Sequence, residues 1–174
     1  MTLRRPKDMR AYFKDIQGRS DGGARFETDF DQFYLCLMVG LDDGRLAPES
    51  ELEPAEFNKG YTAPYKPFAP VIAGMLVEAE MRRQGIPTTK EAIQREVRNL
   101  IEVGNGGTQL KEEGTKLLSR YAARGFELIR EEIPKPRTLE DFLVAYHQRW
   151  NPADGGAEEP EDTEDETAAT PPAS

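Results

Sequence analysis

The residues able to act as nucleophiles, bases or metal ligands are few in this chain of 174 residues, which contains one histidine, His147, and one cysteine, Cys36. One cysteine excludes a disulfide within the chain and a cysteine-based zinc site, and one histidine excludes a histidine cluster. No nucleophile-elbow sequence is present to complete a serine triad with His147. We expect His147 to interact favourably with a helix C-terminus, and Cys36 to be a buried small hydrophobe in the apolar run 33–38.

Two other patterns superficially resemble ligand sites. The segment Gly104-Asn105-Gly106-Gly107-Thr108 lacks the spacing of a P-loop or a dinucleotide-binding loop, which predicts an interhelical turn, although an anion at the following helix N-terminus is physically allowed. Adjacent carboxylates on a helix do not converge, so pairs such as Glu112-Glu113 predict solvated faces. No calcium-ligand series follows Asp42-Asp43-Gly44. The sequence therefore predicts a protein that is not an enzyme and has neither a metal nor a cofactor.

Basic side chains give the most informative pattern, because the net charge of −9 is unevenly divided. Eight of the 32 acidic residues follow Asn151, which leaves 24 acidic against all 23 basic residues before it. Basic residues concentrate in the first 25 positions and again between 82 and 98. If both groups fall on one face, they form a phosphate-binding footprint; unpatterned surface charge is the alternative. The candidate nucleic-acid-binding residues are Arg4, Arg5, Lys7, Arg10, Arg82 and Arg83.

The segments that would position these residues carry mainly helical signals. Apolar spacing together with start and stop residues predicts helices over 6–17, 29–41, 68–84, 88–103, 108–133 and 139–150. The expected caps are Thr28, Thr88 with Glu91, Thr108 and Thr138. A short buried strand is the alternative for 29–41, and Gly125 is a point at which the fifth helix could divide. Residues 42–67 predict a long connection with turn chemistry that wraps the core.

These signals predict an all-α fold, a single-domain helical bundle of about six helices over residues 1–150. Its expected core includes Phe33, Leu37, Leu76, Leu100, Leu118 and Phe142. Residues 151–174 contain no large apolar side chain, which predicts a disordered acidic tail. No apolar segment follows the N-terminal charges or approaches the roughly 20 residues of a membrane span. We therefore expect a cytoplasmic protein with no membrane partner.

Three segments resemble small accessory proteins of bacterial DNA phosphorothioation (Dnd-type) systems. They are the basic opening Arg4-Arg5-Pro6-Lys7-Asp8, the helix end Val39-Gly40-Leu41-Asp42-Asp43-Gly44-Arg45, and Tyr121-Ala122-Ala123-Arg124-Gly125-Phe126-Glu127-Leu128-Ile129. The chain departs from that pattern in its proline-rich connection and its acidic tail. The resemblance implies a non-enzymatic component that works with DNA-modifying or restricting ATPases and nucleases in defence against phage.

The expected function is thus an accessory or adaptor protein of a prokaryotic DNA-modification or anti-phage system, with protein partners and with DNA as a second candidate partner. A helical regulator or assembly factor that binds only protein is the alternative. An enzymatic function is a third and less favoured hypothesis, because no converging acid, base and nucleophile can be named. The sequence gives no indication of the oligomeric state.

Overall fold

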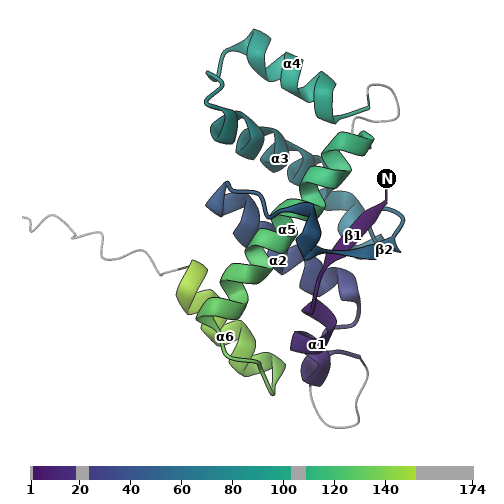
Figure 1. Ribbon diagram of the computed structural model, residues 1–174, viewed down its shortest axis with the longest axis vertical. Helices are drawn as coiled ribbons and strands as arrows, with labels where there is room; N and C mark the ends of the chain where they lie inside the picture. Colours follow the sequence, from purple (N-terminus) through teal and green to yellow (C-terminus); the bar gives the residue numbers. More distant parts are fainter. Residues whose placement is uncertain (1, 19–23, 103–108, 152–174) are drawn as a thin grey trace, which may run out of the picture.

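The computed structural model describes residues 2–18, 24–102 and 109–151, and most of them are helical (Figure 1). Its α-helices are α1 (Met9–Phe13), α2 (Asp29–Asp43), α3 (Ala69–Gln84), α4 (Lys90–Leu100), α5 (Glu112–Glu132) and α6 (Leu139–Trp150). Short 3-10 helical segments lie at Lys14–Ile16, Glu49–Glu51 and Ala63–Phe68. Strands β1 (Leu3–Pro6) and β2 (Leu52–Asn58) pair antiparallel. The mainly helical prediction is confirmed, whereas a purely all-α fold is wrong.

The two strands occupy segments for which the sequence predicts something else. Pro6 ends β1 instead of opening a helix, and the predicted connection 42–67 contains β2. Arg4 pairs with Glu56 and Pro6 with Leu52, with an irregularity between the two pairs. The backbone N–H of Arg4 also donates to Ser119 Oγ of α5 at 3.1 Å. The ribbon therefore forms through contacts between distant segments, which local propensity does not reveal.

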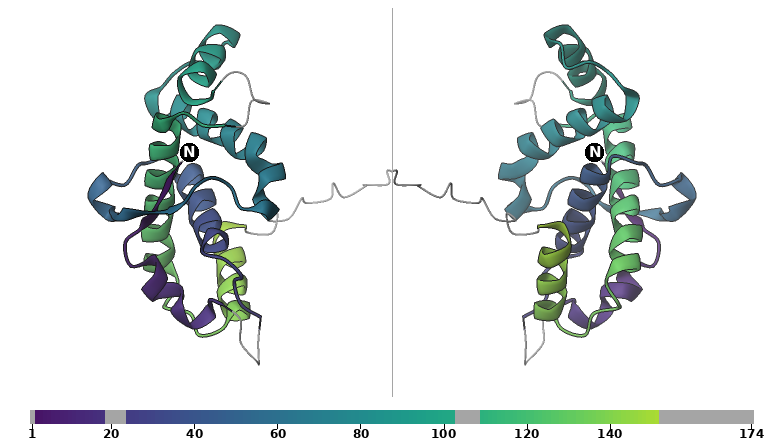
Figure 2. Two further views of the ribbon diagram at one scale, coloured as in Figure 1. Left: turned by 90° about the vertical axis from the view of Figure 1, so that its right-hand side faces the viewer. Right: turned by 90° about the vertical axis from the view of Figure 1, so that its left-hand side faces the viewer.

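Helices α2 and α5 lie side by side in the middle of the molecule, as all views in Figures 1 and 2 show. A Cβ on Gly40 would lie 1.8 Å from the carbonyl oxygen of Tyr121, and a Cβ on Gly125 would lie 1.8 Å from that of Cys36. Only glycine permits this backbone approach. Gly125 does not divide α5, so that alternative is wrong; the residue is the contact point with α2. The helical prediction for 29–41 is confirmed and the strand alternative excluded.

Local signals locate several helix ends correctly. Thr28 and Asp31 form a reciprocal capping box at the start of α2, and Thr138 accepts from the backbone of Asp141 at the start of α6. The cap of α4 is Thr89, which accepts from the backbone of Ala92, and the predicted Thr88–Glu91 box is wrong by one residue. The glycine-rich turn, the predicted cap Thr108 and the acidic tail from residue 152 lie outside the described residues.

The predicted core is confirmed, because all six residues expected in it are at most 2% exposed. Edge-to-face aromatic contacts extend it from α1 to α6, with the ring of Phe13 lying 5.3 Å from that of Phe142 and 5.8 Å from that of Phe26. Cys36 is fully buried in this core, and burial raises the pKa of its thiol. Cys36 thus fits the prediction of a buried apolar side chain and lacks the surroundings of a reactive thiol.

An ion-pair network lies at the C-terminal end of the α2–α5 contact. The guanidinium of Arg45 donates to Asp43 at 2.7 and 3.0 Å, and Arg124 Nε donates to the same carboxylate at 3.1 Å. The Asp43 side chain is 15% exposed. Hydrogen bonds from Arg45 and then Arg124 lower the pKa of Asp43 from 3.8 to about 2.

The glycine contacts predict an unequal response to added methyl groups. Gly40→Ala and Gly125→Ala force the two backbones apart, so each should lower the free energy of unfolding by about 1–3 kcal/mol or more. Gly74→Ala, on the described part of α3, is the matched control because a Cβ there meets no atom within 4 Å. It should be neutral or stabilising by up to about 1 kcal/mol through helix propensity. Urea denaturation measures all three; equal effects at the three positions would contradict the close approach.

Asp43 predicts a dependence of stability on pH. Because its pKa is lower in the folded than in the unfolded chain, its contribution is present above about pH 4 and lost as the pH falls toward 2. Asp43→Asn should therefore cost on the order of 2 kcal/mol at pH 6 and much less at pH 2.5. Urea denaturation of both proteins across this range gives the difference. A difference independent of pH would show that the carboxylate is not coupled to the two arginines.

Candidate functional site

Two of the predicted phosphate-binding residues hold the N-terminal strand in place. Arg5 is 7% exposed, forms an ion pair with Asp29 and donates to Glu53 Oε2 at 3.1 Å. Its guanidinium also lies 5.3 Å from the centre of the Phe57 ring. Arg4 Nε donates to the backbone carbonyl of Glu53 at 2.9 Å. Both guanidinium groups thus have partners that join β1 to β2 and to the start of α2.

The second predicted group is also engaged within the protein. Arg82 donates to the carbonyls of Leu41 and Asp42 at 2.6 and 3.0 Å, at the C-terminal end of α2. Arg83 forms two hydrogen bonds with the carboxylate of Glu80, at 2.7 and 2.9 Å. These contacts leave fewer N–H groups for a ligand.

The structure places the two basic groups at opposite ends of α2. Arg5 contacts Asp29, the first residue of α2, and Arg82 contacts Leu41 in the last turn of α2. These contact points are 12 positions apart in the sequence, which corresponds to about 18 Å of helix. Lys7 is exposed, as is Arg10, whose side chain is 64% exposed and 3.7 Å from Asp29. Nucleic-acid binding by these six residues stays a prediction, carried mainly by Lys7 and Arg10.

A buried carboxylate that the sequence analysis missed joins α3 to α5. Glu80 is 1% exposed and accepts hydrogen bonds from Tyr121 Oη at 2.7 Å, from Arg83 and from Gln84. Burial opposes its ionisation, but these donors outweigh that effect and lower the pKa of Glu80. Its position four residues after the buried Leu76 was the available signal. The network fixes the orientation of α3.

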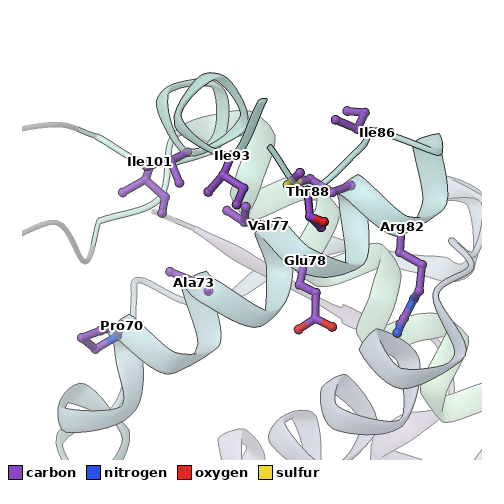
Figure 3. Close-up of a pocket in the computed structure, with 12 residues that line it drawn as sticks. Pro70, Ala73, Val77, Glu78, Arg82, Ile86, Thr88, Ile93 and Ile101 are labelled. Atoms are coloured by element: carbon purple, nitrogen blue, oxygen red, sulfur yellow. The ribbon is translucent and has the colours of Figure 1, made fainter. Parts of the chain in front are cut away.

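A hollow with a volume of about 620 Å³ lies between α3 and α4 (Figure 3). Its walls are mainly apolar, and its lining residues include Ala73, Val77, Met81, Ile86, Ile93, Val97 and Ile101. Gly74 also lines it, and the space above its Cα is empty. Pro70 and Arg82 lie toward its two ends. We call this hollow the α3–α4 groove.

Ile93 shows why the groove escaped the sequence analysis. The predicted inward face of its helix was Ile93, Val97, Leu100 and Ile101, of which Leu100 and Ile101 are buried. Ile93 is instead 39% exposed, because the described helix packs through Ala92, Glu96 and Leu100 at i, i+4 and i+8. Phe68 and Val71, on either side of the groove residue Pro70 in the sequence, are 52% and 59% exposed. The start of α3 thus carries two further exposed apolar side chains.

A second, polar hollow of about 450 Å³ lies near β1 and the start of α5. Its lining includes four glutamates together with Arg4 and Lys116. Lys116 pairs with one of them, Glu112, at 2.8 Å. Among the described residues, no three His, Cys, Asp or Glu side chains are placed to hold a metal ion. This arrangement offers charge but no converging ligands.

Comparisons with models of known protein families, with curated proteins and with solved structures find no match for this chain. Within residues 2–18, 24–102 and 109–151, no helix has both the length and the apolar composition needed to span a membrane. The site assignment therefore rests on the geometry of the chain itself.

The contacts of Arg5 predict that its replacement affects folding before it affects any ligand. Arg5→Ala leaves Asp29 and Glu53 without their buried partner and should lower the free energy of unfolding by about 2 kcal/mol or more. Lys7 is exposed and is in no ion pair among the described residues, so Lys7→Ala should change the free energy of unfolding by less than about 0.5 kcal/mol. Thermal and urea denaturation compare the two. Equal stability of the two variants would show that the contacts of Arg5 do not stabilise the fold, and Arg5 would again be a candidate for binding phosphate.

Proposed function

We propose that this chain is a non-enzymatic adaptor that holds a segment of a partner protein in the α3–α4 groove. The observation that carries the proposal is an apolar hollow open to solvent, with Ile93 in its wall and with Phe68 and Val71 exposed at the start of α3. Contiguous exposed apolar surface costs solubility and is typical of interaction sites.

The shape of the groove favours a peptide or helix over a compact small molecule. Its volume of about 620 Å³ suits either ligand. However, its lining extends along α3 from Pro70 to Arg82, which corresponds to about 18 Å or three helical turns. Helices docked in grooves use apolar anchors at i, i+3 or i+4, and i+7, a spacing that matches this length.

We further propose that the partner is an ATPase or nuclease of a prokaryotic DNA-modification or anti-phage system, with duplex DNA as a second candidate ligand of Lys7 and Arg10. The support is the resemblance of segments 4–8, 39–45 and 121–129 to Dnd-type accessory proteins. The latter two segments contact each other through Gly40, Tyr121 and Gly125. The alternative function, a regulator or assembly factor that binds only protein, would use the same groove for a partner that is unrelated to DNA modification.

Site-specific photocrosslinking in the native host tests the proposed function. A photoreactive amino acid at Ile93 should give a crosslink to a defence ATPase or nuclease, identified by mass spectrometry. The same residue placed at Val144, which is 51% exposed on α6, is the matched control. Gly74→Trp should abolish the Ile93 crosslink by filling the groove, whereas Gly74→Ala should retain it.

The contrary results of this experiment are specific. Identical crosslinks from Ile93 and Val144, or a crosslink that survives Gly74→Trp, would remove the groove as the binding site. A crosslink that depends on the groove but joins a protein unrelated to DNA modification would support the regulator or assembly factor instead.

A further inference from the structure

We propose that the outer face of α4 binds duplex DNA, with the helix lying in the major groove. Three features of α4 support this. Its cations have no partners within the described chain, they lie on the face opposite the buried one, and the helix forms one end of the molecule. This surface is separate from the α3–α4 groove and would bind DNA whether or not that groove holds a partner protein.

The cations of α4 are not used by the fold. Lys90, Arg95 and Arg98 are exposed, and their side chains take part in no ion pair or hydrogen bond among the described residues. Nearly every other arginine of that part of the chain has a carboxylate or carbonyl partner, and Arg137 is the other exception. A guanidinium without an internal partner can bind a phosphate or the edge of a guanine.

The exposed polar side chains of α4 lie opposite its buried face. At about 100° per residue, five long polar side chains fall within an arc of about 140° around the helix. In order around that arc they are Lys90, Gln94, Arg98, Glu91 and Arg95. The middle of the arc is about 170° from the middle of the one that holds the buried Ala92, Glu96 and Leu100. Ile93 and Val97, which line the α3–α4 groove, lie between the two arcs on one side.

The residue types of this outer arc are those that read base edges. Arginine and lysine pair with guanine, glutamine pairs with adenine, and glutamate accepts a hydrogen bond from cytosine. Gln94 and Arg98 lie toward the middle of the arc, where side chains of a helix in the major groove reach the base pairs. Lys90 and Arg95 lie at its two edges, within reach of the phosphates on either side.

The shape of this part of the molecule suits the same ligand. α4 lies at one end of the molecule in Figures 1 and 2, so a duplex can approach its outer face. It follows α3 after the five residues 85–89, and two helices joined by a short turn with a glycine commonly present the second helix to the major groove. A helix with its side chains is about as wide as that groove, roughly 12 Å.

Acidic side chains near α4 are outnumbered or lie off this face. Glu91 is the one carboxylate in the arc, against three cations. The carboxylate of Glu78 in α3 points away from α4 in Figure 3, and Glu102 lines the polar hollow together with Glu56 of β2. The net charge of −9 for the whole chain opposes binding at long range. We therefore expect the affinity to be measurable at low salt and to fall steeply as salt is added.

A fluorescein-labelled duplex of random sequence, about 30 base pairs long, provides the probe. Fluorescence anisotropy with the full-length protein should show binding whose log K falls by about 0.9 per decade of salt for each phosphate contact. Lys90→Ala with Arg95→Ala removes two such contacts and should reduce this slope by about 2. Lys59→Ala with Lys66→Ala, which removes two exposed cations outside α4, is the matched control and should leave the slope unchanged.

A second variant tests the base contacts. Selection of duplexes from a random pool should give a preferred sequence for the wild-type protein. Gln94→Ala with Arg98→Ala should reduce discrimination against mismatched duplexes by at least about fivefold, since a paired contact with a base contributes about 1 kcal/mol or more. Alanine favours helices, so these variants should stay folded, and circular dichroism checks this.

The contrary outcomes are distinct. Absence of duplex binding by the wild-type protein at low salt, or an unchanged slope for Lys90→Ala with Arg95→Ala, would overturn the proposal. A slope reduced instead by Lys7→Ala with Arg10→Ala would assign the DNA to the N-terminal cations. Tighter binding of single-stranded DNA or of RNA would overturn the major-groove contact. Loss of the Ile93 crosslink in the α4 variants, with DNA binding unchanged, would make this face part of the protein site.

Discussion

The backbone contact between α2 and α5 is the constraint on which the rest of the described structure depends. At Gly40 and Gly125 the two helices come so close that each glycine lies against a backbone carbonyl oxygen of the neighbouring helix. From this position α5 supports β1 through Ser119 and reaches α3 through Tyr121 and Glu80. The orientation of α3, and hence one wall of the groove, depends on the Tyr121–Glu80 hydrogen bond and therefore on where the glycine contact places α5.

Sequence reasoning succeeded where the determining information is local. The spacing of Leu76, Leu100 and Phe142 within their own helices is enough to predict that they are buried, and it does so correctly. Thr28 and Thr138 were recognisable as caps because their partners lie three residues away. The periodicity of α4 is less decisive, since apolar residues occupy two adjacent faces and only packing selects Ala92 and Leu100.

What escaped prediction depends on residues that are far apart in the sequence. Pro54 and two glutamates, Glu53 and Glu56, argue against a strand at 52–58, yet pairing with β1 overrides that local preference. The sequence displays Arg5 and Arg83 as cations but does not show that Asp29, Glu53 and Glu80 are their partners. The groove was unpredictable for the same reason, because a hollow between two helices exists only once their relative placement is known.

The same long-range contacts bear on how the chain folds. Arg124 and Asp43 are 81 residues apart, and Arg4 and Ser119 are 115 apart, so the central contact requires the closure of very large loops. Helical proteins with short interhelical loops reach their native contacts much sooner. The α3–α4 pair, joined by the five residues 85–89, is by contrast a local unit. We expect this pair to form early and to wait for α2 and α5 to meet, with its apolar surface exposed to other chains during that interval.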